Sequence, residues 1–172
     1  ILDPDRKKMS KSKGNVITPV DTIEEYGADA VRYWAASARL GTDTTYDENV
    51  FLVGNKLVTK MYNAAKFVLS HDSYQINKLN EIDASFLKDL EEMVNNVTAY
   101  YENFQFAQAL QITEEFFWNT YTDNYLELVK KRVFNSDGDD KASAVTCLRL
   151  GLSVILRLLA PVLPTITEEI WS

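Results

Sequence analysis

The sequence predicts a mostly α-helical protein, an antiparallel helical bundle preceded by a short basic loop. Three observations favour this fold class. Apolar residues recur at three- and four-residue steps in four long segments between residues 47 and 159. No strand-like alternation of apolar and polar residues follows Ile17. Short polar connections separate the long segments, so neighbouring helices should pack antiparallel at shallow angles.

Composition limits the classes of function. With 172 residues and a net charge of −7, the chain can bury one sizeable core but is not a free-standing nucleic-acid binder, so any RNA contact must be local. A single cysteine and a single histidine exclude an internal disulfide and predict no metal site. No apolar run suggests a membrane span, so we expect no membrane partner and a cytoplasmic location. Because the sequence starts without Met and stops early in a helix, we expect a fragment.

The first thirteen residues reverse the sign of the chain's charge. They hold two acids and five cations, namely Arg6, Lys7, Lys8, Lys11 and Lys13. Two serines alternate with the lysines, and Gly14 follows, where backbone freedom is useful. Lysine is a compact charge on a flexible stem, so such a loop can close over a phosphate chain. The alternative is a solvated linker, since lysine and serine are common in linkers.

Two short helices should follow the loop. Thr18 suits an N-cap and Pro19 the first helical position, and this helix should end at Gly27. A second helix is predicted over 28–37, and an irregular connection over 39–46. For Asp29 and Arg32 on the second helix, pairing or capping within the helix is one interpretation and a contact with a partner is the other.

The first two long helices are the clearest. One should run from an Asp47 N-cap to about Ser70, with its apolar face inward and Lys56, Lys60, Asn63 and Lys66 outward. After a polar loop in which His71 is a capping or surface residue, Asp83 should cap the next helix. That helix has apolar residues at the helical period as far as Phe104.

The third and fourth long helices should be central. The segment 106–134 carries two apolar stripes, both of which end at Leu128, so it should be contacted on more than one side. Its aromatics, together with two earlier tyrosines, could stack on RNA bases, but their helical spacing favours core packing; they are Tyr100, Tyr101, Trp118, Tyr121 and Tyr125. A helix over 140–159 should hold a buried Cys147, and a last helix should begin with a capping box of Thr165 and Glu168.

The pentapeptide Lys8-Met9-Ser10-Lys11-Ser12, continued by Lys-Gly-Asn, resembles the KMSKS signature of class I aminoacyl-tRNA synthetases. One specified pentapeptide occurs by chance in a chain of this length on the order of once in ten thousand sequences. The resemblance implies that Lys8 and Lys11 contact the ATP phosphates while an amino acid attacks the α-phosphate. All five residues of the motif would form the ATP-binding set. Mg²⁺ would accompany ATP as substrate, and the fragment would hold no metal or cofactor of its own.

Softer motifs extend the resemblance over nearly the whole chain. Segments 55–57, 63–69, 104–110, 125–130 and 159–171 are similar to the valine-specific branch of that family, with the isoleucine-specific branch as the near alternative. Segment 119–124 departs from the family pattern. The resemblance implies three parts: the KMSKS loop at 1–17, a helical connector at 18–46 that resembles a stem-contact segment, and an anticodon-binding bundle at 47–172.

The implied activity is that of a longer parent enzyme. It would join valine to its tRNA through valyl-adenylate, and the fragment alone would be inactive. Expected partners are ATP, valine and a valine-specific tRNA. The candidate tRNA contacts are Arg32, Lys56, Lys60, Asn63, Lys66, Lys130, Lys131 and Arg132. A competing hypothesis from another class is a helical protein-interaction module whose basic N-terminal tail is only a linker.

Overall fold

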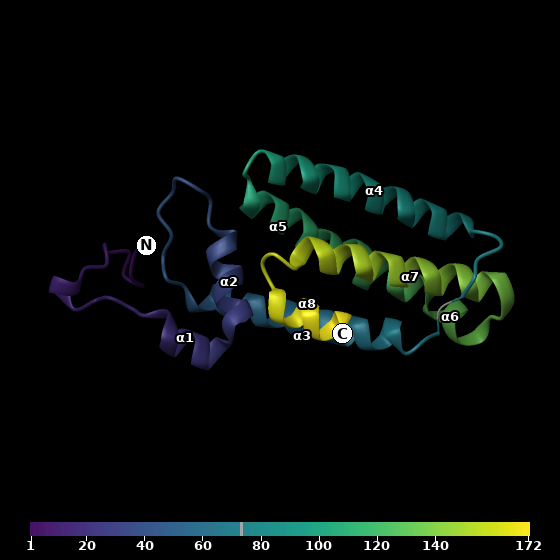
Figure 1. Cartoon of the computed structure of the whole chain (residues 1–172), viewed down its shortest axis with the longest axis horizontal. Coiled ribbons are helices and arrows are strands. Elements are labelled where there is room, and N and C mark those ends of the chain that lie inside the picture. The colour runs from purple at the N-terminus through teal and green to yellow at the C-terminus, as the bar shows by residue number, and fades with distance from the viewer. Residues whose placement is uncertain (73) are drawn as a thin grey trace.

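A computed structural model describes residues 1–72 and 74–172 and confirms the predicted helical class (Figure 1). The basic loop and two short helices form one end of the elongated molecule, and the long helices run side by side along the rest. In chain order the helical elements are η1 (Lys11–Lys13), α1 (Pro19–Tyr26), α2 (Ala28–Ser37), α3 (Glu48–Leu69), α4 (Glu81–Glu102), α5 (Phe106–Glu115), η2 (Phe116–Leu126), α6 (Glu127–Asn135), α7 (Gly138–Leu159) and α8 (Pro164–Trp171).

The boundaries of the first helices agree with the predictions. Helix α1 begins at Pro19 after Thr18, and Gly27 ends it with φ of 83°, a conformation that favours glycine. Helix α3 is capped by Asp47, whose carboxylate accepts a hydrogen bond from the Asn49 N–H. Local sequence signals are sufficient here because the capping groups lie within three residues of the helix ends.

The third long helix is continuous but changes its winding. Its middle part, η2, is a π-helix with i→i+5 hydrogen bonds, between the α-helical parts α5 and α6. The wider turns shift the buried face, so the prediction that Leu128 lies on the apolar stripe is wrong. Leu128 is 55% exposed, whereas Val129 and Val133 are fully buried.

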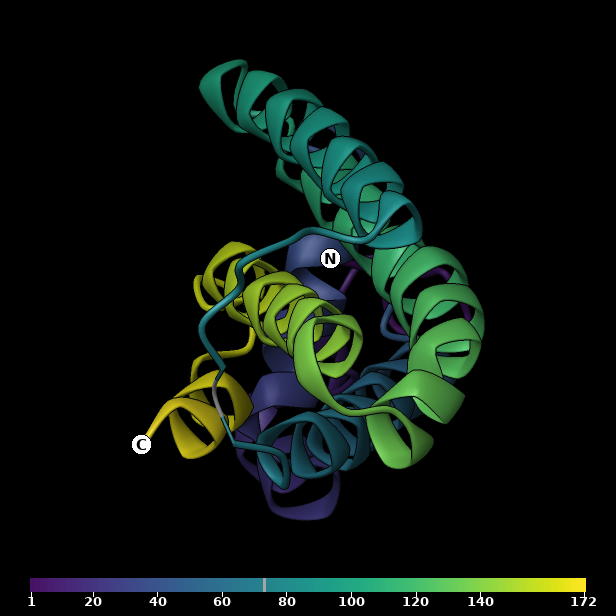
Figure 2. The same cartoon turned by 90° about the vertical axis from the view of Figure 1, so that its right-hand side faces the viewer.

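Helix α7 is the centre of the bundle and contacts α3, α4, α5, η2, α6 and α8 (Figure 2). Gly151 permits the closest approach, because a Cβ there would lie 2.8 Å from both Phe86 Cζ and Tyr121 Cε2. Tyr121 is fully buried and donates its hydroxyl to the Leu148 carbonyl at 2.7 Å. Tyr125 stacks on Phe86 with ring centroids 3.8 Å apart. The core role of these two tyrosines is thus confirmed.

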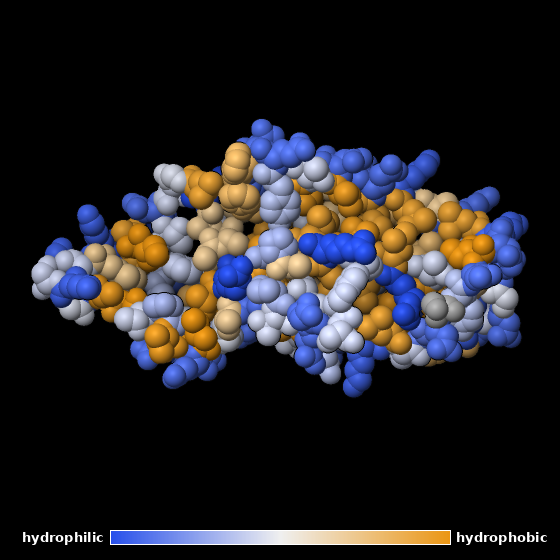
Figure 3. All heavy atoms as spheres, in the orientation of Figure 1, coloured by the Kyte–Doolittle hydropathy of each residue, from blue (hydrophilic) through white to orange (hydrophobic). Residues whose placement is uncertain are grey.

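The apolar character of α7 corrects one expectation. Gly138–Leu159 is long and apolar enough to cross a membrane, although the sequence suggested no such run. The bundle covers 61% of its most apolar window, which is typical of the core helix of a soluble protein. Figure 3 shows that hydrophobic residues remain at the surface over this part of the molecule. Leu150 of this helix is 45% exposed. Cys147 is buried as predicted, and burial raises the pKa of its thiol to about 11.

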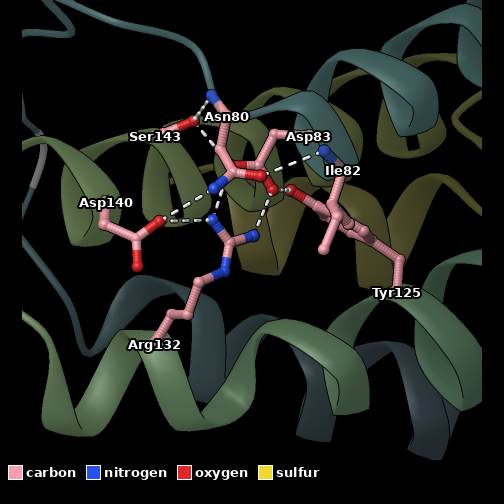
Figure 4. A network of polar contacts seen from close by, with 7 residues as sticks. All are labelled: Asn80, Ile82, Asp83, Tyr125, Arg132, Asp140 and Ser143. Atoms are coloured by element: carbon pink, nitrogen blue, oxygen red, sulfur yellow. Dashed lines mark hydrogen bonds and ion pairs between the residues drawn. The ribbon is translucent and has the colours of Figure 1, made fainter.

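A buried polar network fastens α4, η2, α6 and α7 together (Figure 4). Asp83 has no exposed surface and accepts hydrogen bonds from the Tyr125 hydroxyl at 2.7 Å, from the Ser143 hydroxyl and from both terminal nitrogens of Arg132. The prediction that Asp83 caps a helix is therefore wrong. Asn80 caps α4 instead, with its side-chain oxygen 3.0 Å from the Ile82 N–H.

The cap of α8 also differs from the prediction. No side chain at the start of α8 caps it, so the expected box of Thr165 and Glu168 does not form. The carboxylate of Asp29 on α2 accepts hydrogen bonds from the N–H groups of Thr165 and Ile166, at 3.2 and 2.8 Å. Arg32, one turn later, donates to the carbonyls of Pro161 and Val162. These two residues of α2 thus hold the α7–α8 turn, rather than pairing within their own helix.

Candidate functional site

The base of the basic loop is attached to the connection that follows α2. The Leu2 N–H donates to the Thr44 carbonyl at 2.8 Å, and the Tyr46 N–H donates to the Leu2 carbonyl at 2.9 Å. Leu2 also forms an isolated antiparallel bridge with Lys8, on the other side of the loop. Backbone contacts at Leu2 therefore hold the two sides of the loop together, and the loop projects at one end of the molecule (Figure 1).

Three of the four lysines of the loop are free to bind an anion, whereas Lys7 pairs with Asp5 at 3.3 Å. Lys8, Lys11 and Lys13 are exposed, and within residues 1–72 and 74–172 none of them forms an ion pair. Lys11 and Lys13 lie on the 3₁₀ turn η1, which ends at Gly14 with φ of 67°. The hydroxyls of Ser10 and Ser12 lie 2.7 Å apart and share a hydrogen bond. Figure 3 shows mainly hydrophilic residues at this tip.

Met9 faces a different environment from its neighbours in the motif. It lines an apolar pocket together with Ile17, Pro19, Trp34 and Phe51. A thioether adapts to an irregular apolar space, so Met9 is suited to pack the loop against the residues that line this pocket. Its place in the predicted ATP-binding set therefore suits an anchor better than a phosphate contact.

The predicted tRNA-contact residues of α3 lie on its outer face. Lys56, Asn63 and Lys66 are exposed. Lys60 pairs with Asp123 of η2 at 2.9 Å, and its ammonium lies 5.0 Å from the centre of the Trp118 ring. The ammonium group of Lys60 is thus already bound within the chain, whereas Lys56 and Lys66 have no ion-pair partner in the described part of the chain.

The candidate cations outside α3 differ in how available they are. Lys131 is exposed, and Lys130 forms an exposed pair with Glu127 at 3.0 Å, which water and salt would weaken. The Arg132 side chain is only 16% exposed and is bound to Asp83 and Asp140. The Arg132 guanidinium is engaged by two carboxylates and mostly buried, so we remove Arg132 from the predicted contacts. Arg32 is exposed and uses only part of its guanidinium on the Pro161 and Val162 carbonyls, so it stays a predicted contact.

The structure brings the two remaining groups of lysines onto neighbouring helices. Near the end of α3, the ring of Phe67 contacts Phe134 of α6 with centroids 5.8 Å apart, and His71 packs edge-on against both rings. His71 therefore packs against these rings and is partly buried, so the prediction of a capping or surface residue is wrong. The periodicity of single helices could not predict this neighbourhood, because it depends on how α3 and α6 pack.

Sequence reasoning missed two residues that shape the loop, Asp3 and Asn15. Asp3 is 7% exposed, and its carboxylate accepts hydrogen bonds from the Asn15 side-chain amide at 2.8 Å and from the Lys7 N–H at 2.7 Å. The Asn15 amide and the Lys7 N–H keep the pKa of Asp3 below its ordinary value. The only signal in the sequence was the Lys-Gly-Asn that continues the motif.

Two family models match the chain. The model described as "Anticodon-binding domain of tRNA ligase" matches residues 83–172, just over half of the chain. The model described as "tRNA synthetases class I (I, L, M and V)" matches residues 1–47, which contain the basic loop, α1 and α2. The two matched ranges agree with the resemblance that the KMSKS string indicated.

Curated relatives match from end to end. The valine–tRNA ligase of Leifsonia xyli is 49% identical over 178 residues, which covers 99% of this chain and 20% of that protein. The valine–tRNA ligase of Thermobifida fusca is 50% identical over 179 residues, which covers 100% of this chain and 20% of that protein. The chain thus spans about a fifth of the length of these relatives.

Solved structures share the fold at lower identity. The ternary complex of Agrobacterium radiobacter LeuRS with tRNA and LeuAMS has a TM-score of 0.70 at 24% identity, covering 98% of this chain and 21% of that one. The Mycobacterium tuberculosis methionyl-tRNA synthetase in complex with methionyl-adenylate has a TM-score of 0.75 at 22% identity, covering 99% and 36%. Together with the matched models, these findings show that the chain belongs to the family of tRNA ligase anticodon-binding domains, preceded by a segment of the class I tRNA synthetase family.

Proposed function

We propose that this chain is part of a class I valine–tRNA ligase, and that it supplies the ATP-phosphate loop and the anticodon-binding bundle. The observation that carries the proposal is the identity of about one half to valine–tRNA ligases over the full length of the chain. We assign residues 1–17 to the loop of the catalytic domain, 18–46 to the connector and 47–172 to the bundle. The reaction would take place in the cytoplasm, with ATP, valine and tRNA as substrates.

In the first step, a carboxylate oxygen of valine would attack the α-phosphorus of ATP. The bond from that phosphorus to the oxygen bridging to the β-phosphate would break, and pyrophosphate would leave with the electron pair. Lys8 and Lys11 would bind the leaving group more tightly as its charge grows, which lowers the barrier. In the second step, a hydroxyl of the terminal tRNA adenosine would take the valyl group from the adenylate, and AMP would leave.

Mg²⁺ would reach the site with ATP, whose phosphates would supply ligands and whose charge the ion would reduce. Among the described residues, no group of three or more His, Cys, Asp or Glu side chains could hold a metal ion. The lysines of the loop would act beside the ion on the phosphate oxygens.

The amino-acid specificity can be tested on the full-length enzyme by ATP–pyrophosphate exchange. We expect exchange to depend on valine, with kcat/KM at least about tenfold lower for isoleucine, because one extra methylene must be excluded from the amino-acid pocket. Isoleucine as the better substrate would instead support the isoleucine-specific branch. Absence of exchange with either amino acid would contradict the proposed function.

The tRNA surface can be tested by charge reversal on α3. We expect Lys56→Glu combined with Lys66→Glu to weaken binding of valine-specific tRNA to the full-length enzyme several-fold and to reduce the slope of log Kd against log salt by about one per lost phosphate contact. The matched control is Lys78→Glu combined with Lys88→Glu, which reverses two exposed lysines, one before α4 and one on it, and changes the net charge by the same amount. If the α3 variant binds tRNA as the control does, this face of α3 is ordinary surface.

A further inference from the structure

The basic loop needs something other than regular secondary structure to hold its shape. Its only helical part is the three-residue turn η1, and its exposed lysines repel one another. A flexible chain of this kind would present its ammonium groups at many positions, and electrostatic stabilisation of a leaving group is strongest when the charges are already in place. The contacts at the base of the loop therefore determine how well the lysines can act.

One side chain, Asn15, takes part in more hydrogen bonds inside the loop than any other side chain does. Its Oδ1 accepts a hydrogen bond from the Ser10 N–H at 2.9 Å, and its Nδ2 lies 3.3 Å from the Lys8 carbonyl, which it donates to. Asn15 thus binds the peptide groups on both sides of Met9, much as a neighbouring strand would. Ser10 is also the N-cap residue of η1, the turn that carries Lys11.

Asp3 fastens Asn15 to the base of the loop. The same Nδ2 donates to Asp3 Oδ2 at 2.8 Å, while the other oxygen of this carboxylate accepts from the Lys7 N–H. The Asp3 backbone is held as well, since its N–H donates to the Lys7 carbonyl at 2.9 Å and its carbonyl accepts from the Arg6 N–H at 2.8 Å. Through Asp3, Asn15 is connected to Leu2 and to the connection after α2.

From this geometry we propose that Asn15 is a positioning residue for adenylate formation, and that with Asp3 it forms a clasp that presents Lys8 and Lys11 to the phosphates. The inference rests on the proposed function, because it assigns the lysines to the departing pyrophosphate. Asn15 itself touches neither ATP nor valine in this proposal. It acts through the backbone of residues 8 to 10.

The clasp requires a side chain at position 15 that both donates and accepts hydrogen bonds. An aspartate at position 15 has nearly the same shape and could still accept from the Ser10 N–H, but when ionised it could not donate to Asp3 or to the Lys8 carbonyl. Two facing carboxylates also repel each other, and one of them then takes up a proton more readily than an isolated carboxyl group does. Protonation would restore a donor, so an Asn15→Asp enzyme should recover as the pH falls.

The experiment compares the full-length wild-type enzyme with Asn15→Asp in valine-dependent ATP–pyrophosphate exchange between pH 6 and pH 8.5. At pH 8 we expect kcat to fall by at least about tenfold with KM for valine nearly unchanged, the size expected when hydrogen bonds to a charged group are lost. The ratio of variant to wild-type kcat should rise towards pH 6. Adding Asp3→Asn to Asn15→Asp should recover part of the loss, because Asn at position 3 can donate to Asp at position 15.

Three comparisons decide between outcomes. Asn95→Asp changes an exposed asparagine of α4 and should leave kcat unchanged at every pH. If Lys11→Ala lowers kcat but Asn15→Asp does not, the clasp is refuted and the proposed function stands. A loss that is independent of pH, is not recovered by Asp3→Asn and accompanies a lower Tm would show a merely structural role and would also overturn the inference. Unchanged kcat in Lys11→Ala would refute the proposed function, and this inference with it.

Discussion

Replacing Lys11 by alanine in the full-length enzyme is expected to lower kcat for valine-dependent ATP–pyrophosphate exchange by about 100- to 1,000-fold, the usual effect of removing one preorganised charge-stabilising group. Lys11 is exposed at the start of η1 and forms no ion pair with any described residue, so its charge is available to the phosphates. Because the lysine would stabilise the leaving pyrophosphate and not bound valine, KM for valine should change little. Steady-state exchange kinetics at saturating ATP measure both quantities.

Lys13→Ala is the matched control for this prediction. Lys13 lies on the same turn, is equally exposed and carries the same charge, but stands outside the five-residue motif. Its removal should alter kcat much less than removal of Lys11 does. Equal losses in both variants would mean that the loop acts only through its total charge, and an unaltered rate in Lys11→Ala would remove the role that we assign to Lys11.

Replacing Asp83 by alanine is expected to destabilise the bundle by about 3–5 kcal/mol, the cost of leaving one member of a buried ion pair without its partner. Arg132 would keep only the partly exposed Asp140, and the hydroxyls of Tyr125 and Ser143 would lose their acceptor. Burial together with the hydrogen bond to Asp83 raises the pKa of Tyr125, so the phenol stays neutral and cannot replace the missing anion. Urea unfolding, monitored by circular dichroism, measures this change in the free energy of unfolding.

Asp140→Ala is the comparison for Asp83→Ala. Asp140 contacts the same guanidinium, but its side chain is 44% exposed, so its removal should cost about 1 kcal/mol or less. If Asp83→Ala does not fold, Asp83→Asn can be measured in its place, since it keeps the shape and one acceptor while it removes the charge. Similar stabilities for the two alanine variants would contradict the view that the network is held by its buried anion.

Amphipathic periodicity predicted the helices well because most of their signals are local. Asp47 and Gly27 act within a few residues of themselves, and the apolar stripe of α3 is a property of α3 alone. The failures share another property. In place of the predicted capping box of Thr165 and Glu168, α8 is capped by Asp29, which lies 136 residues away from Thr165 in sequence. Asp83 does not cap a helix and instead contacts three other helical segments. An acidic residue near a predicted helix start matches the capping pattern whether it caps that helix or binds a partner far away in the sequence.

The candidate site also has one part that the sequence predicts and one part that depends on packing. The KMSKS string could be recognised from residue order, because that chemistry needs several flexible cations close together in the chain. Arg132 and Lys131 are adjacent and have the same charge, yet Arg132 is buried against Asp83 while Lys131 faces solvent. Sequence alone could not separate them, because the change of winding in η2 sets which side of α6 faces the core.

The order of residues was thus enough to predict a mostly helical chain and to single out the KMSKS loop, since helical period, caps and a contiguous motif are encoded over short distances. Packing alone established which polar side chains are available. Asp3 and Asn15 meet across the loop, Asp29 reaches α8, and Arg132 reaches Asp83. A buried polar group must find a partner wherever the fold brings one within hydrogen-bonding distance, and that partner can lie anywhere in the chain.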